Sequence, residues 1–273
     1  MMRNAVPCVL ALLVAAAFAD TYLLRLGNGL DPIRYEVQIE AKQHVGPDEQ
    51  TIKASYEFTH QALKIADDGR IPTLVTFGPG EGTLEHQAGT VTLSWSYEGA
   101  QALLMYRPNS RLTQALTALK DPAQGASMDP LAGYALAAWS IPLLEGSVEP
   151  GASVMNDLAD EPSVTGTVLM HRRVITTFDE VRDVAGARAA FLSAVSEQKL
   201  ADDHPTLSGS SVVEIKSALD IDTGWVLAAD AVESGEVTVK TGPAAGTVVT
   251  TDELKCRIRI VDGPEVEFPT GDS

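Results

Sequence analysis

The stretch that most constrains the fold of this chain is residues 219–240, LDIDTGWVLAADAVESGEVTVK. The Asp-Thr-Gly at positions 222–224 predicts a tight turn between two strands, and a second polar break is expected before position 236. Beyond that break the side chains alternate strictly, with Val237 and Val239 on one face and Glu236, Thr238 and Lys240 on the other. A period of two residues is that of a β-strand with one buried face. The stretch therefore predicts an antiparallel sheet with one face in water.

The same alternation recurs along most of the chain. It predicts strands at residues 35–42, 51–60 and 90–97, with a bulge at Gln61 and Ala62 and a Gly- and Pro-rich loop over residues 72–82. The larger inward side chains form a candidate apolar ligand face, which we call the predicted apolar face. Its members are Tyr35, Val37, Ile39, Tyr56, Phe58, Trp95 and Tyr97.

The period changes in the middle of the chain. Leu112, Ala115, Leu116 and Leu119 are spaced as one face of a helix, which predicts a helix at residues 110–120. A second short helix is predicted at residues 130–139, and the two are expected to cross the sheet like a lid or a plug. Residues 187–199 are compatible with helix or strand. A repeat of Lys-(Ile/Leu)-Ala-Asp-Asp at positions 64–68 and 199–203 favours strand.

The chain begins with a secretory signal. Arg3 precedes an apolar run, and Ala17 and Ala19 provide the small residues of a cleavage site before Asp20. We therefore expect residues 1–19 to be removed and the protein to be periplasmic or secreted. The remainder is predicted to be one β-rich domain over residues 20–261, with candidate halves 20–140 and 152–261 joined by a linker at 141–151. Residues 262–273 are expected to form a flexible acidic tail.

Charge and cysteine content narrow the classes of partner. The formal net charge of −17 disfavours binding to nucleic acid or to anionic lipid surfaces. No apolar stretch beyond the signal approaches the length needed to span a membrane. Cys256 would be the one cysteine left after cleavage, so no intramolecular disulfide is expected. Its alternation with Leu254, Ile258 and Ile260 indicates a small buried side chain on a strand.

Motifs for catalysis or metal binding are weak. The five histidines (His44, His60, His86, His171 and His204) form no zinc-binding pair at helical spacing. His60 falls on the apolar face of its strand, which indicates a core histidine more than a base. Asp220 and Asp222 resemble the start of a calcium loop, but Ala231 stands where the twelfth-position ligand is needed, so a hairpin turn is the better interpretation. No catalytic residues, metal site or cofactor are therefore predicted, and the chain is not expected to be an enzyme.

Three segments resemble a known family. They are residues 22–41 (YLLRLGNGLDPIRYEVQIEA), 142–151 (PLLEGSVEPG) and 219–239. The family comprises exported bacterial proteins of unknown function whose fold is compared with the open antiparallel β-barrels of lipoprotein carriers. Its members commonly have a tryptophan after the Pro-Gly pair, where this chain has Ala152, Ser153 and Val154. The resemblance implies a fold and an extracytoplasmic location, but no catalytic residues.

The predicted fold is mainly β, with some helix: a curved antiparallel sheet or half-barrel with two short helices in the middle of the chain. A concave apolar face is where such folds bind ligands. We therefore expect a non-catalytic binding or carrier module for an apolar or amphipathic ligand, or alternatively a structural or envelope-interaction protein with a packed core. A hydrolase without recognisable motifs is the third hypothesis. The corresponding partners are a lipidic ligand or another envelope protein.

Overall fold

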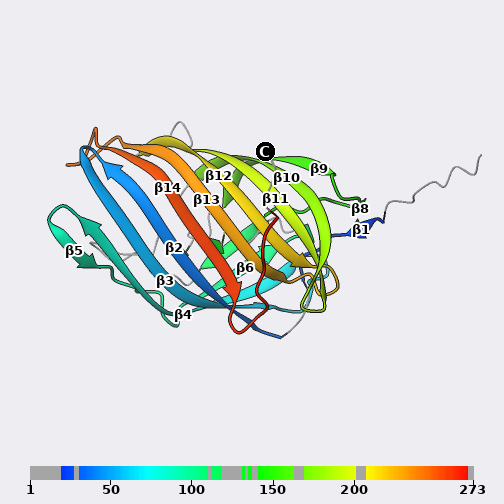
Figure 1. Ribbon diagram of the computed structural model, residues 1–273. Helices are drawn as coiled ribbons and strands as arrows, with labels where there is room; N and C mark the ends of the chain where they lie inside the picture. Colours follow the sequence, from blue (N-terminus) through cyan, green and yellow to red (C-terminus); the bar gives the residue numbers. More distant parts are fainter. Residues whose placement is uncertain are drawn as a thin grey trace, which may run out of the picture.

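One large antiparallel sheet dominates the structure, a computed structural model (Figure 1). The structure describes residues 20–27, 31–109, 112–117, 131–132, 135–136, 141–162, 169–200 and 207–269. The sheet has twelve strands: β2 (Ile33–Val45), β3 (Asp48–Ala62), β4 (Ile71–His86), β5 (Gly89–Thr92), β6 (Gln101–Tyr106), β7 (Leu112–Thr117), β9 (Ser153–Pro162), β10 (Leu169–Val184), β11 (Ala187–Leu200), β12 (Leu207–Asp220), β13 (Val226–Val239) and β14 (Val248–Ile260). β1 (Tyr22–Leu23) and β8 (Ser147–Val148) pair separately.

The order of the strands places the two ends of the chain's β-region at the centre of the sheet. The order is β7-β6-β4-β3-β2-β14-β13-β12-β11-β10-β9, with β5 paired to β4. The chain thus runs from the centre to one edge, crosses to the other edge and returns. β14 closes against β2, with Cys256 opposite Ile39. This pairing makes one continuous sheet of two series of hairpins.

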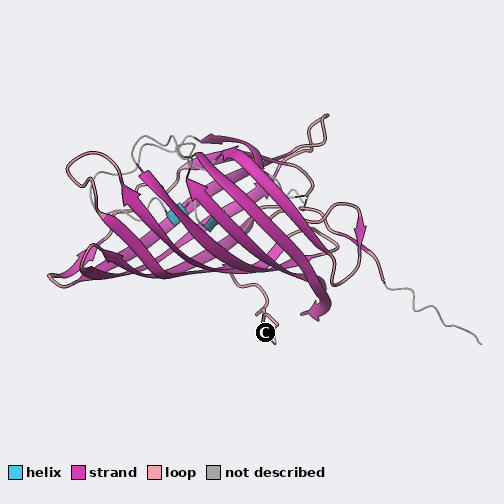
Figure 2. Ribbon diagram, turned by 90° about the horizontal axis from the view of Figure 1, so that it is seen from above, coloured by secondary structure: helices cyan, strands magenta, loops and turns pink. Residues whose placement is uncertain are grey.

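The sheet curls around a single main core (Figures 1 and 2). Its two end strands, β7 and β9, contact each other, although the described residues form no hydrogen-bonded ladder between them. Alternation explains the burial, because Tyr35, Val37, Ile39 and Ala41 are all buried on β2 while the residues between them are exposed. The prediction of a mainly antiparallel, curved sheet with one wet face is confirmed.

The two predicted helices are not borne out. Residues 112–117 form the strand β7, in which Ala115 lies opposite Leu104 of β6. The apolar spacing fitted a helix, but β6 offers an open edge, and Thr113 and Thr117 favour extended backbone. Of the second predicted helix, the described residues 131–132 and 135–136 are helical, and the rest lies outside the described residues. None of the described helical residues belongs to a helix long and apolar enough to cross a membrane.

The predicted loop at residues 72–82 is also wrong, because it lies within β4. Gly78 and Gly80 allow this segment to form a strand where neighbouring side chains lie close to its backbone. A Cβ atom on Gly80 would lie 2.9 Å from the Cβ of Tyr56 and 3.0 Å from the Trp95 ring. The irregularity expected at residues 61–62 instead lies between Tyr56 and Phe58, where two residues of β4, Gly78 and Pro79, stand opposite one residue of β3. Ala62 keeps the inward alternation and is fully buried.

The strand predicted at residues 90–97 is only partly present. β5 ends at Thr92, and Val91 is 39% exposed. Leu93 and Tyr97 are buried beyond the end of the strand. The alternation therefore identified which of these later side chains enter the core, but not the extent of the strand.

Two ambiguous segments of the second half are continuous strands. Residues 187–199 lie within β11, as favoured from the sequence. β13 passes through the polar break expected before residue 236, and a shift of register between Glu233 and Gly235 takes its place. A Cβ atom on Gly235 would lie 2.5 Å from the Cβ of Ser211, so a glycine lets β13 approach β12 at the bulge.

The segment after β14 packs on the outside of the sheet. Val266 is buried against Phe191 and Leu227, and the Phe268 ring meets the Phe191 ring edge-on at 6.0 Å. Lys216 Nζ donates a hydrogen bond to the carbonyl oxygen of Pro269. Residues 262–269, expected from the sequence to belong to a flexible tail, thus cover an apolar part of the outer face; residues 270–273 lie outside the described residues.

Candidate functional site

The predicted apolar face lies inside the core. Trp95 is partly buried, and the other six residues are at most 3% exposed. Tyr35 stacks on Phe58 with ring centroids 5.1 Å apart, and Tyr56 stacks on Trp95 at 4.9 Å. Tyr35 Oη donates a hydrogen bond to the carbonyl oxygen of Val226. These side chains form an aromatic part of the main core, over β2, β3 and the segment after β5.

The inner face of β9 to β13 combines apolar core residues with several polar side chains. Asn156, Val174, Ser196, Val213 and Glu233 lie opposite one another on the five neighbouring strands from β9 to β13. Residues directly opposite in an antiparallel sheet share a face. Val174 and Val213 belong to the main core, so Asn156, Ser196 and Glu233 also point inward.

Two more polar residues of β10 point the same way. Thr176 lies two residues after Val174, between Val154 of β9 and Ala194 of β11, and is fully buried. Arg172 lies two residues before Val174 and is half-buried, with its Nε atom covered. We call Asn156, Arg172, Thr176, Ser196 and Glu233 the inner polar cluster.

Three members of the inner polar cluster have polar atoms that lack a hydrogen bond. Thr176 Oγ1, Ser196 Oγ and Asn156 Nδ2 are buried and have no hydrogen-bond partner among the described residues. A buried polar group without a partner costs about 1–3 kcal/mol. Such groups are rare in folded proteins and are often bridged by water or a ligand. Three within adjacent strands therefore mark this part of the interior as a candidate binding site.

Glu233 has a different environment at the β13 end of the cluster. Burial raises the pKa of its carboxyl group, and the hydrogen bond from Ser211 partly offsets this effect. Raising the pKa of a carboxyl group favours its neutral form.

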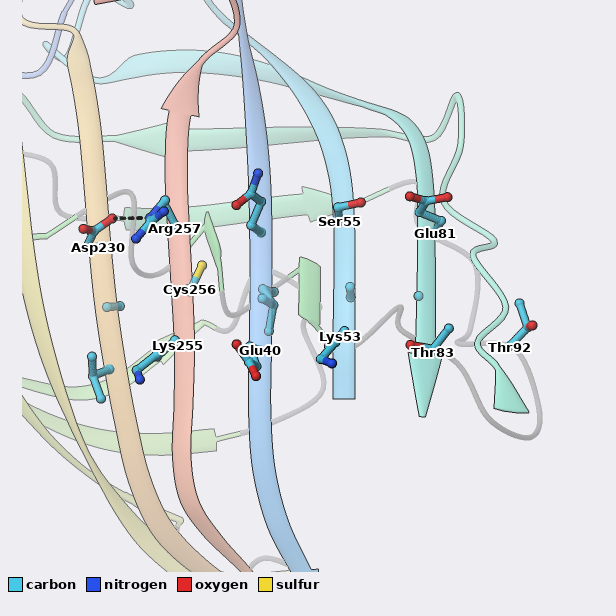
Figure 3. Close-up of a pocket in the computed structure, with 16 residues that line it drawn as sticks. Glu40, Lys53, Ser55, Glu81, Thr83, Thr92, Asp230, Lys255, Cys256 and Arg257 are labelled. Atoms are coloured by element: carbon cyan, nitrogen blue, oxygen red, sulfur yellow. Dashed lines mark ion pairs between the residues drawn. The ribbon is translucent and has the colours of Figure 1, made fainter. Parts of the chain in front are cut away.

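A groove lies on the opposite, outer face of the sheet (Figure 3). It has a volume of about 880 Å³ and crosses β13, β14, β2, β3, β4 and β5. Lys255, Glu40 and Lys53 follow one another on adjacent strands across it. Cys256 belongs to the inner face of β14, where burial raises the pKa of its thiol well above the usual range.

The charges of this outer groove are matched within the protein. Lys53 lies 3.6 Å from Glu85, and Asp230 lies 3.9 Å from Arg257 and 2.6 Å from Arg259. Ion pairs in contact with water contribute at most about 1 kcal/mol each. The groove is therefore a solvated surface of alternating charge, with no excess of either sign directed at a ligand.

The remaining sequence candidates do not converge. His60 is fully buried beside Trp225, with ring centroids 5.2 Å apart, whereas His44 and His171 pair with exposed Asp252 and Asp157. His204 lies outside the described residues. Within the described part of the chain, no group of three or more His, Cys, Asp or Glu side chains is placed to hold a metal ion.

The acidic turn after β12 is a hairpin turn, as predicted. The Asp220 carboxylate accepts hydrogen bonds from the amide of Asp222 and the hydroxyl of Thr223. Its oxygens are thus engaged by the turn itself. Arg188 pairs with Asp222 from the neighbouring hairpin.

Sequence reasoning missed the inner polar cluster. The alternation in β10 contained its signal, because Val174 and Phe178 fix the inward parity and Thr176 and Arg172 share it. The same parity places Ser196 inward on β11. Inward polar residues interrupt the apolar pattern of a strand and match no known catalytic spacing, so the sequence pattern alone does not mark them.

Comparisons with known proteins give little further information. No family model and no curated protein matches the sequence. Among solved structures, an outer membrane channel from Pseudomonas putida F1 is matched over 90% of this chain and 98% of that chain, with 8% identity and a TM-score of 0.26. A TM-score this low establishes neither a shared fold nor a shared function. The resemblance to exported proteins with carrier-like open barrels stays a prediction.

Proposed function

We propose that this protein is an exported, non-catalytic binding or carrier module for an amphipathic ligand. The observation that supports the proposal most directly is a group of buried polar atoms on the inner face of a sheet whose core is otherwise mainly apolar. Stacked aromatic rings and aliphatic side chains form that core over β2 and β3 and continue over β9 to β13. Among them, Asn156, Thr176 and Ser196 on β9, β10 and β11 have polar atoms without a partner among the described residues.

The apolar core and the buried polar atoms provide different contributions to binding. An apolar tail gains about 25 cal/mol for each Å² that it removes from water against the apolar core. A polar head group would satisfy Thr176, Ser196 and Asn156, whose partnerless atoms otherwise destabilise the folded state. A ligand with both parts thus matches the interior better than a purely apolar or a purely polar one.

A fluorescence titration with 11-(dansylamino)undecanoic acid tests this function. The proposal predicts saturable binding of one probe per chain and a blue shift of the dansyl emission. The variant Ile175→Ser, on the outer face, is the control and should bind the probe equally. Absence of saturable binding by the folded protein would exclude the carrier function.

The outer face supports a second candidate function, that of an envelope-interaction protein. Met155, Ile175 and Val195 lie opposite one another on β9, β10 and β11 and are 62%, 44% and 44% exposed. Adjacent exposed apolar side chains are typical of protein-binding surfaces. A photo-crosslinking residue placed at Ile175 should then capture one discrete protein in the organism that expresses the chain. Capture of the same protein from Thr59, on the outer face of β3, would argue against this surface.

A further inference from the structure

We propose that Asn156, Thr176 and Ser196, together with the charge of Arg172, bind the anionic head group of the amphipathic ligand, a carboxylate or a phosphate. This inference rests on the proposed carrier function and specifies the chemistry of the ligand. These residues lie on the inner face of β9, β10 and β11, where the sequence contains no recognised binding motif.

The three residues surround Val174 on the inner face. Asn156 and Ser196 lie opposite Val174 on the two flanking strands, and Thr176 is its next inward neighbour along β10. Adjacent strands are about 4.8 Å apart, so Asn156 and Ser196 are separated by about 10 Å between backbones. The buried side chain of Val174 occupies the position between them, so a head group would contact them on the interior side of Val174.

All three residues present hydrogen-bond donors. The partnerless atom of Asn156 is its amide nitrogen, which can only donate, and the hydroxyls of Thr176 and Ser196 can each donate one hydrogen. A ligand that satisfies them must supply acceptor oxygens. Arg172, two residues along β10 from Val174, places a positive charge on the same face, which favours an anion.

Burial strengthens the discrimination between an acid and its neutral derivative. Thr176 and Ser196 are fully buried, so water competes weakly for their hydroxyls. A site built of buried donors rejects a ligand that cannot pair with all of them. A fatty acid should therefore bind more tightly than its methyl ester, which has the same apolar tail.

The test measures the dissociation constants of 11-(dansylamino)undecanoic acid and of its methyl ester for the full chain and for variants. The unaltered protein should bind the acid at least about tenfold more tightly than the ester. The double variant T176V/S196A should weaken binding of the acid by about tenfold and leave binding of the ester unchanged. Arg172→Gln should also weaken binding of the acid alone.

The control is Thr177→Val, which removes a hydroxyl from the outer face of the same strand. It should leave both dissociation constants unchanged. Circular dichroism and thermal unfolding verify that each variant is folded. Because Thr176 Oγ1 has no hydrogen-bond partner to lose among the described residues, Thr176→Val is expected to keep the melting temperature of the unaltered protein or to raise it.

Competition experiments distinguish the head group of an amphiphile from a free anion as the bound species. Dodecyl phosphate should displace the dansyl acid at far lower concentration than inorganic phosphate does, and equal potency would overturn the head-group assignment in favour of a free-anion site. Equal affinity of the unaltered protein for the acid and the ester would also overturn the head-group assignment. It would mean that the hydroxyls of Thr176 and Ser196 bind water and not the ligand. If neither probe binds, the carrier function itself fails.

Discussion

At the scale of the residue, burial sets the protonation state of His60. Burial lowers the pKa of its imidazole from an ordinary value of about 6.5 to about 3. The folded protein therefore favours neutral His60, and the stability gained from this preference is present above pH 6.5 and lost as the pH falls toward 3. Between pH 7 and pH 4 the loss amounts to about 3 kcal/mol.

The variant His60→Phe keeps an aromatic ring beside Trp225 and removes the titration. We predict that the unfolding free energy of the unaltered protein falls by about 3 kcal/mol more than that of the variant between pH 7 and pH 4. Urea unfolding at several pH values measures this difference, with His44→Phe on the outer face as the control. Parallel curves for unaltered protein and His60→Phe would show that His60 is hydrated or protonated in the folded state.

The partnerless hydroxyl of Thr176 gives a second prediction at this scale. Thr176→Val keeps the shape of the side chain and removes a buried polar group that has no hydrogen-bond partner among the described residues. We expect the ligand-free protein to gain about 1 kcal/mol of unfolding free energy, as measured in urea. A loss of similar size would mean that the hydroxyl is already satisfied by water, and the argument for a ligand at this position would fail.

At the scale of the element, Gly235 determines how β13 passes β12. A Cβ atom there would lie 2.5 Å from Ser211 Cβ and 2.6 Å from the backbone oxygen of Ser210. Gly235→Ala should therefore destabilise the protein by about 2–3 kcal/mol, since backbone atoms must move. Gly242→Ala meets no atom within 4 Å and has φ +85°, so only the conformational cost of about 1 kcal/mol is expected. Equal losses in urea unfolding would contradict the close approach at the bulge.

The segment after β14 gives a prediction about the outer face. Val266 is 5% exposed and covers Phe191 and Leu227, whereas Glu267 beside it is exposed. Val266→Ser should lower the unfolding free energy by about 2 kcal/mol because apolar surface returns to water. Glu267→Ser should change it by less than about 0.5 kcal/mol. A negligible effect of Val266→Ser would show that the segment is detached in solution.

At the scale of the whole molecule, the sequence predicts which face of a strand is buried better than it predicts which strands pair with each other. Strict alternation identified the inward residues of β2 and β3, because burial on one side of a strand leaves a period of two. It could not predict that β14 pairs with β2, since contacts between segments so far apart leave no local pattern. Residues 112–117 were mistaken for helix because β6, not the segment itself, decides their conformation.

The candidate site was less predictable than the fold for a related reason. Inward polar residues such as Thr176 and Ser196 break the apolar pattern that sequence reasoning follows, so they look like solvent-facing positions. Their significance depends on the burial that the curled sheet creates. The predicted apolar face was placed inward correctly, but its residues contact one another in the core.

Native mass spectrometry of the protein, expressed in its host and purified without detergent, tests the proposed carrier function most directly. We expect a bound species of one acidic amphiphile per chain that is released on denaturation. Protein stripped of ligand should then take up one molecule of oleic acid. A single mass corresponding to the polypeptide alone, before and after addition of oleic acid, would contradict the carrier function.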